Sequence, residues 1–149
     1  MLARTAAGVL SNHLDAEVKI RTFYIKPDLR IHAEEVQIND KKQNPMIYVG
    51  ELDAKLSLRD LADELRVRRL NIDDLLINLV KYEDEYQMNI SELFASDNTE
   101  VKEKGTNKNP KMIYLDELNL SRGHFVLWNQ NKDKPEKVSM DYAHIDIDI

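Results

Sequence analysis

Segment 65–82 shows the hydrophobic pattern that recurs through most of the chain. It reads LRVRRLNIDDLLINLVKY, and apolar residues occupy every second position in short runs, such as Leu70 with Ile72 and Ile77 with Leu79. A period of two places successive side chains on opposite faces of a strand, so each run predicts a strand with one apolar and one polar face. The polar pair at 73–74 interrupts the alternation and predicts a turn or a bulge.

The segment 117–128 has the same pattern further along the chain. Leu118-Asn119-Leu120 matches Leu70-Asn71-Ile72, and Leu120 stands 48 positions after Ile72 (120 minus 72). A polar break at 121–123 follows, and the alternation then resumes. The match predicts a strand-turn-strand unit that is used more than once, with a shorter version at 36–40.

Outside these segments, the sequence predicts one amphipathic helix, two short helices and one loop. Segment 2–14 has the one-sided apolar spacing of an amphipathic helix. Capping residues predict short helices at 58–64 and 90–95. Segment 96–111 is charged and nearly free of apolar residues, which predicts a flexible loop.

The alternation changes phase at three places, which are 34–35, 50 and 73–74. Phase shifts of this kind indicate β-bulges, and bulges curve a sheet. The polar turns between most runs are short, which favours antiparallel pairing. We therefore expect a mainly β fold with short α segments, in which an N-terminal helix precedes a curved antiparallel sheet. The pattern leaves open whether the sheet forms an open groove or closes into a sandwich or barrel.

Composition narrows the class of protein. The chain of 149 residues fits a single domain, 1–149, and its net charge of −6 argues against a nucleic-acid partner. Cysteine is absent, which excludes disulfides and thiolate metal sites. No apolar run has the ~18–20 residues that cross a bilayer. Alternation continues through Ile145, Ile147 and Ile149, so we expect a fragment of a longer protein.

Few residues suggest a chemical site. His144, Asp146 and Asp148 would share one face of a strand, which is a permissible metal arrangement. The solvent face of an amphipathic strand explains them better, so we expect no metal site. No glycine loop, nucleophile–base arrangement or paired catalytic carboxylate is present, so we expect neither an enzyme nor a cofactor. Arg66 and Arg68 alternate with Val67 and would suit phosphate headgroups or a solvated strand face equally well.

The order of these elements resembles a known family. The resemblance lies in an amphipathic helix and then in alternating pairs and polar positions: Val18-x-Ile20, Leu29-x-Ile31, Val36-x-Ile38-x-Asp40, the segment 52–61, Leu70-x-Ile72, Ile77-x-Leu79, Asn89-Ile90-x-x-Leu93 and His144-Ile145. This pattern is similar to the N-terminal region of the AsmA/TamB family of envelope proteins, most of all to the TamB-type members of Bacteroidota. It covers nearly the whole chain, although this chain lacks the inner-membrane anchor of family members.

The resemblance implies a repeating β-groove in the periplasm that is tethered to the inner membrane. It implies bridge-like movement of phospholipid between the two membranes and a linked role in outer-membrane protein assembly. Two alternatives remain: a scaffold that pairs with partner strands at a sheet edge, and a closed structural β-domain. We also expect self-association through the C-terminal strand. The residues expected to line the groove are the alternating apolar ones: Val18, Ile20, Leu29, Ile31, Val36, Ile38, Leu52, Ala54, Leu70, Ile72, Ile77, Leu79, Leu118, Leu120, Phe125 and Leu127.

Overall fold

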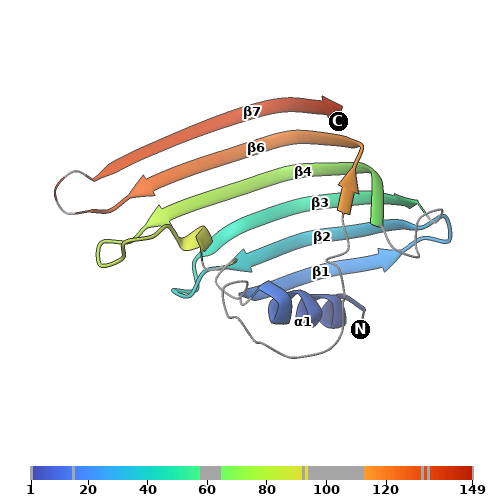
Figure 1. Ribbon diagram of the computed structural model, residues 1–149, viewed down its shortest axis with the longest axis horizontal. Coiled ribbons are helices and arrows are strands. Elements are labelled where there is room, and N and C mark those ends of the chain that lie inside the picture. Colours follow the sequence, from blue (N-terminus) through green and yellow to red (C-terminus); the bar gives the residue numbers. More distant parts are fainter. Residues whose placement is uncertain are drawn as a thin grey trace, which may run out of the picture.

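The computed structural model describes residues 2–14, 16–57, 65–91, 93, 113–131, 133 and 135–148. It consists of one helix and one sheet (Figure 1). The helix α1 spans Leu2–Leu14, and the strands are β1 (Glu17–Ile25), β2 (Arg30–Asn39), β3 (Pro45–Ser57), β4 (Leu65–Lys81), β5 (Ile113–Leu115), β6 (Glu117–Asn129) and β7 (Glu136–Asp148). The expected helix at 58–64 and the expected loop at 96–111 lie outside the described residues. The fold is mainly β, as the alternation predicts.

All the strands belong to one seven-stranded sheet. Their order is β1-β2-β3-β4-β6-β7, and the short β5 pairs with the start of β4. Among the described residues, β1 and β7 each pair with a single strand and do not meet one another. The sheet is therefore open, and the alternative of a closed sandwich or barrel is wrong.

The expectation of a wholly antiparallel sheet is also wrong, because β4 and β6 run parallel. Segment 82–116 connects them, and it is far longer than the roughly dozen residues that a crossover needs. The parallel register pairs Leu70 with Leu118 and Ile77 with Phe125. The offset of 48 positions in the sequence is thus the register of two neighbouring strands. Moreover, 65–81 is one continuous strand rather than a strand-turn-strand unit.

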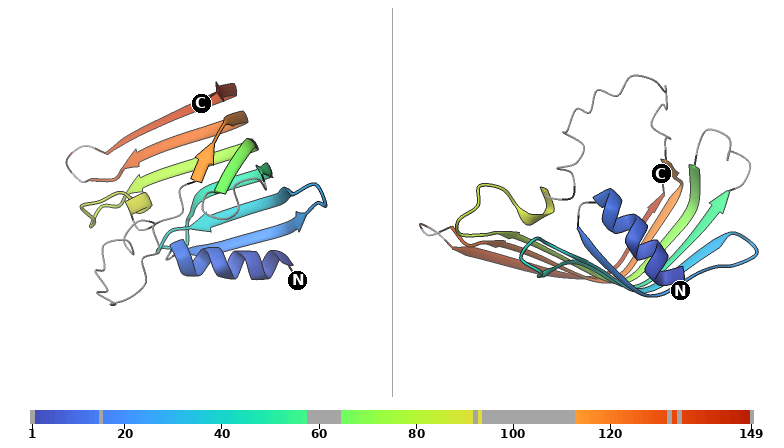
Figure 2. Two further views of the ribbon diagram at one scale, coloured as in Figure 1. Left: turned by 45° about the vertical axis from the view of Figure 1, so that its right-hand side comes forward. Right: turned by 90° about the horizontal axis from the view of Figure 1, so that it is seen from below.

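A line of irregular positions crosses the whole sheet. At one level of the sheet, each long strand has a residue without a paired partner, and it stands beside the unpaired residue of the neighbouring strand. Glu35, Asp74 and Arg122 at these positions have positive φ angles of 49°, 57° and 49°, which depart from extended strand geometry. Both strands of each pair skip a residue here, so the register does not shift at this level; the register shifts that indicate β-bulges lie at Ile38/Asn39 and Lys55/Leu56. Because the irregular positions stand at the same level in every long strand, the sheet folds along one line (Figure 2). We call this line the crease; it consists of Arg21, Glu35, Gly50, Asp74, Arg122 and Ala143.

Gly50 shows how closely the strands approach at the crease. A Cβ atom at this position would lie 2.8 Å from the Cβ of Asp74. Real Cβ atoms do not come so close, and the Asp74 Cβ is fixed to the backbone, so only glycine fits there without a shift.

The crease keeps the apolar side chains on one face. Ile72 and Leu75 are three positions apart, and in an ideal strand they would point to opposite faces. The irregular residue at the crease interrupts the alternation, so both fall on the same face, and neighbouring strands share this change because their pairing continues in the same register on both sides of the crease.

Burial and polarity together indicate which face lies inside the bend. On the apolar face beside the crease, Val49 and Leu75 are only 6% and 8% exposed. The side chains of Glu35, Asp74 and Arg122 in the crease itself are exposed. The opposite face also has buried residues, such as His32 and Val126 at 6% and 8% exposed, so burial alone does not distinguish the faces. We assign the apolar face to the concave side because the inside of a bend shields apolar side chains from water; we call it the trough, and the opposite face the outer face.

One aromatic side chain fills a gap in the trough floor. Gly123 on β6 pairs with Tyr142 on β7. A Cβ at Gly123 would lie 1.7 Å from the Cζ of Tyr142, so the ring occupies the space that another residue would fill. Burial raises the pKa of the Tyr142 hydroxyl.

Helix α1 lies beside β1, on the inner side of the bend (Figure 2). It packs through small residues: Ala7 is buried, and the Oγ of Ser11 accepts a hydrogen bond of 3.0 Å from the N–H of Val18. Leu2, Val9 and Leu10, which belong to the apolar stripe of the predicted helix, are 60%, 53% and 40% exposed. The helix is present where the sequence predicts it, but these three apolar side chains are exposed instead of packing on the sheet.

A buried polar network holds the segment after β4 in place. The carboxylate of Asp40, 2% exposed, accepts hydrogen bonds from the backbone N–H groups of Lys42 and Asn44 at 3.0 Å each. It also accepts bonds from the Tyr82 hydroxyl and from Asn89 Nδ2. Asn89 Oδ1 in turn accepts the N–H of Val80 at 3.0 Å. Asn89 therefore bonds the backbone of β4, and it opens a 3₁₀ turn at 89–91. Of the helix expected at 90–95, only 90, 91 and 93 are described, all with 3₁₀ geometry, and the other positions lie outside the described residues.

Candidate functional site

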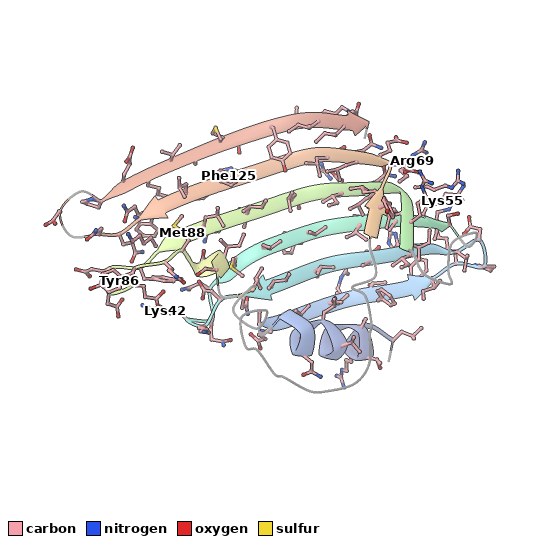
Figure 3. The ribbon with its side chains drawn as sticks, in the orientation of Figure 1. Lys42, Lys55, Arg69, Tyr86, Met88 and Phe125 are labelled. Carbon is pink, nitrogen blue, oxygen red and sulfur yellow. The ribbon has the colours of Figure 1, made fainter. Side chains whose placement is uncertain are left out.

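The trough is the candidate site, and the structure places nearly all the predicted groove residues in it. Leu29 is the exception: it lies in the turn between β1 and β2 with a φ of 61°. The register puts the others in rows across the trough face, and these are Val18, Ile20, Ile31, Val36, Ile38, Leu52, Ala54, Leu70, Ile72, Ile77, Leu79, Leu118, Leu120, Phe125 and Leu127. Phe125 is labelled on β6 in Figure 3.

The same rows contain apolar residues that the sequence-based list leaves out. Ile47 pairs with Ile38 and with Ile77, and Leu75 pairs with Val49. Ile145 and Ile147 continue the rows of Leu120 and Leu118 onto β7. The alternation that marks the predicted residues also marks these, so the signal was present in the sequence.

The trough floor follows the crease, across the strands rather than along them. Six strands spaced about 4.8 Å apart give a floor of about 24 Å. One leaflet of acyl chains in a bilayer occupies about 15 Å, half of the hydrocarbon thickness. A single acyl chain could therefore lie extended along the floor.

The trough is covered unevenly. At the β1 end, next to α1, Val18 is 5% exposed. At the β7 end, Met140, Ile145 and Ile147 are 57%, 38% and 42% exposed. An apolar floor that remains open to solvent at one end favours an apolar ligand or a further strand as its partner.

The outer face carries ion pairs and amide hydrogen bonds around Asp73 and Glu117, whereas Val80 and Val126 are buried apolar residues on the same face. Arg122 Nε donates to Asp73 at 2.9 Å, which lowers the pKa of that carboxyl. Asn119 donates to Glu117 and to Asn71, and hydrogen bonds from Asn119 and Arg69 lower the pKa of Glu117. These groups are largely exposed, so each pair contributes little to stability.

The most buried titratable group on the outer face is His32. Its Nδ1 lies 3.0 Å from Asp53 Oδ1, and its Nε2 lies 3.2 Å from Glu34 Oε1. Burial disfavours the charged imidazole, but the hydrogen bonds to Asp53 and Glu34 and the charge of Glu51 outweigh it and raise the pKa of His32. No local pattern in the sequence marks this cluster.

The metal arrangement considered from the sequence, at His144, Asp146 and Asp148, lies on β7. His144 Nε2 lies 2.9 Å from Asp146, but both side chains are more than half exposed. The side chain of Asp148 lies outside the described part of the chain.

Basic residues gather on the outer face at one end of the strands. A hollow of about 320 Å³ is lined by Lys26, Arg30, Lys55 and Arg69 together with Asp53 and Asn71. Figure 3 shows Lys55 and Arg69 at this end, opposite the end that carries Tyr86 and Met88. Arg30 and Arg69 are each paired with a carboxylate, at Asp28 and Glu117. The pairing reduces the charge available to an anion in this hollow.

No protein-family model, no curated protein and no solved structure matches this chain. In the described part of the chain, no helix has the length and hydropathy that a membrane span requires. The fold and the trough geometry are therefore the observations from which a function can be argued.

Proposed function

We propose that this chain is a non-enzymatic lipid-binding module whose trough holds acyl chains, as part of a bridge-like carrier of phospholipid between the inner and outer membranes. The observation that supports it most is the set of apolar rows that the pairing register places across one face of an open, creased sheet. The resemblance to AsmA/TamB envelope proteins supports a periplasmic setting with an anchor to the inner membrane.

The physics of the trough suits a ligand that moves. Each methylene that leaves water contributes about 0.8 kcal/mol, and this gain needs no directional contact. Rows of Ile, Leu and Val present nearly equivalent positions, so an acyl chain binds firmly in total and still slides. A charged headgroup would remain in water at the open side of the trough.

A charge in the trough floor tests the proposal. Ile72 lies on β4, in the row next to the crease. In Ile72→Asp we expect the affinity for a fluorescent fatty acid to fall at least about tenfold, because burying an unpaired carboxylate costs several kcal/mol. Binding is measured by fluorescence titration of the folded proteins.

Asn71 provides a matched control, since it is the neighbouring residue and lies on the outer face. Asn71→Asp adds the same charge and keeps an oxygen to accept the hydrogen bond from Asn119. We expect it to bind the fatty acid like the wild type. Undiminished binding in a folded Ile72→Asp protein would overturn the trough proposal.

A second candidate function rests on the edge strand β7. Among the described residues it pairs only with β6, so one side of its 13 residues presents free backbone groups. Such an edge can accept a strand from another protein, as an outer-membrane assembly factor would require. The two functions differ in outcome: strand addition at β7 would survive Ile72→Asp, whereas lipid binding would not.

A further inference from the structure

We propose that His32, Glu51 and Asp53 on the outer face form a binding site for a divalent transition metal, with Zn²⁺ as the ion that fits best. The site lies on the face opposite the trough, and it does not depend on the lipid-binding proposal. It is built from the two adjacent strands β2 and β3.

The backbone register brings the three side chains together. His32 pairs directly with Asp53, and Glu51 sits two residues away on the same face of β3. Their ligand atoms all lie within 4.8 Å of one another. His32 Nδ1 is 3.0 Å from Asp53 and 4.0 Å from Glu51. Tetrahedral Zn²⁺, with bonds of about 2.0–2.1 Å, separates neighbouring ligand atoms by about 3.3 Å, so small side-chain rotations suffice.

The imidazole is oriented for this role by a fourth residue. His32 Nε2 faces Glu34 Oε1 at 3.2 Å, and an ionised carboxylate can only accept a hydrogen bond. Nε2 therefore carries a proton. Nδ1, which faces Asp53 at 3.0 Å, carries a proton by the same argument, and a metal ion bound at Nδ1 would displace that proton. Metal-binding histidines commonly donate their second N–H to a carboxylate in this way. The Tyr24 ring packs beside the imidazole, with centroids 4.8 Å apart and the planes tilted by 32°.

Charge and access agree with a divalent ion. The charge of Glu34 is already balanced by a protein side chain, because Arg21 Nη2 lies 3.1 Å from Glu34 Oε2. Asp53 and Glu51 provide two further carboxylates beside one imidazole, and Zn²⁺ would balance both. The His32 side chain is only 8% exposed, whereas that of Glu51 is 53% exposed. The imidazole is thus fixed within the protein, and solvent can deliver the ion and a water as fourth ligand.

Calorimetric titration of the metal-free protein with Zn²⁺ tests the site, at about pH 7.5, where the imidazole can give up a proton to a metal. We expect one saturable site per chain. His32→Gln removes a proposed ligand of the metal. It should therefore weaken Zn²⁺ binding by more than the loss of a supporting residue does, which is typically about 10-fold to 100-fold. Glu51→Gln should also weaken binding, and its exposed position leaves the fold intact, so it decides the matter if His32→Gln does not fold.

His144→Gln is the matched control. It removes an exposed histidine–aspartate pair from the same face, and we expect its Zn²⁺ affinity to equal that of the wild type. The proposal is overturned if neither Zn²⁺ nor Co²⁺ binds saturably, in which case the cluster is a protonated histidine among carboxylates. It is also overturned if Glu51→Gln and a folded His32→Gln bind like the wild type, or if His144→Gln alone loses binding.

Discussion

At the residue scale, Asp40 shows how a single polar side chain fixes the course of the chain. Its carboxylate is almost inaccessible to solvent, yet four donors reach it, from Lys42, Asn44, Tyr82 and Asn89. Burying a charge is costly unless hydrogen bonds replace those of water. Asp40 meets this condition, and it joins the β2–β3 turn to the segment that leaves β4.

Removing this acceptor should destabilise the fold. In Asp40→Ala the hydroxyl of Tyr82 and the amide of Asn89 each lose a buried partner, so we expect the free energy of unfolding to fall by about 2–4 kcal/mol. Urea unfolding followed by circular dichroism measures the change. Asp133→Ala, at an exposed position in the β6–β7 turn, should change stability by less than about 0.5 kcal/mol. Equal stability of the two variants would show that the network contributes nothing.

The sequence predicts the residues of the trough face, but not the cluster of His32, Glu51 and Asp53. Alternation identified the trough face because it is a local signal with a period of two. His32, Glu51 and Asp53 give no local signal, since 19 positions separate His32 from Glu51 (51 minus 32). They meet only through the β2–β3 register, in which paired positions have a constant sum: His32 with Asp53 and Glu34 with Glu51. Predicting this cluster would have required the register of the hairpin first.

At the element scale, the crease explains why the alternation changes phase. Three of its positions coincide with the phase shifts read from the sequence, at 34–35, 50 and 73–74, and Arg122 falls in the polar break at 121–123. The alternation could not distinguish a turn or a bulge from an irregular position inside a continuous, in-register strand, because all three interrupt the pattern with polar residues. It could not give the direction of β6 either, since an amphipathic strand has the same period in both directions.

The positive φ at Asp74 reverses the usual preferences of a strand. At an ordinary strand position, valine is favoured and glycine is disfavoured. At a φ of 57°, valine is strained and glycine is not. We expect Asp74→Gly to be neutral or to stabilise the protein by up to about 1 kcal/mol, and Asp74→Val to destabilise it by about 1–3 kcal/mol. Urea unfolding of both variants gives the order of stability.

Asp73 supplies the comparison for that experiment. It is next to Asp74 but has ordinary strand geometry and is bonded to Arg122. Asp73→Gly should therefore destabilise the protein, by about 1 kcal/mol from backbone entropy alone. If Asp74→Val is more stable than Asp74→Gly, the crease does not depend on the left-handed backbone at this position.

At the scale of the whole molecule, the two ends of the sheet are unlike. Helix α1 lies against β1, whereas no described residue pairs with the free backbone edge of β7, and its trough face is exposed. A long, exposed strand edge is a template for pairing with another chain. Adding a strand there would extend the ladder and cover Met140, Ile145 and Ile147 at the same time.

We therefore predict concentration-dependent self-association through β7, detectable by sedimentation at micromolar and millimolar concentrations. Two proline variants, Ile145→Pro and Asp146→Pro, make the test specific. Along an edge strand, the N–H groups of adjacent residues point alternately toward the neighbouring strand and away from it. The variant whose lost N–H points away from β6 loses only a donor for a second chain, so its self-association should weaken while the monomer keeps its stability. The variant whose lost N–H points toward β6 loses a hydrogen bond within the sheet, so its stability should fall. A wild-type protein that remains monomeric at both concentrations would show that the β7 edge does not pair, and strand addition would then lose its support as a second function.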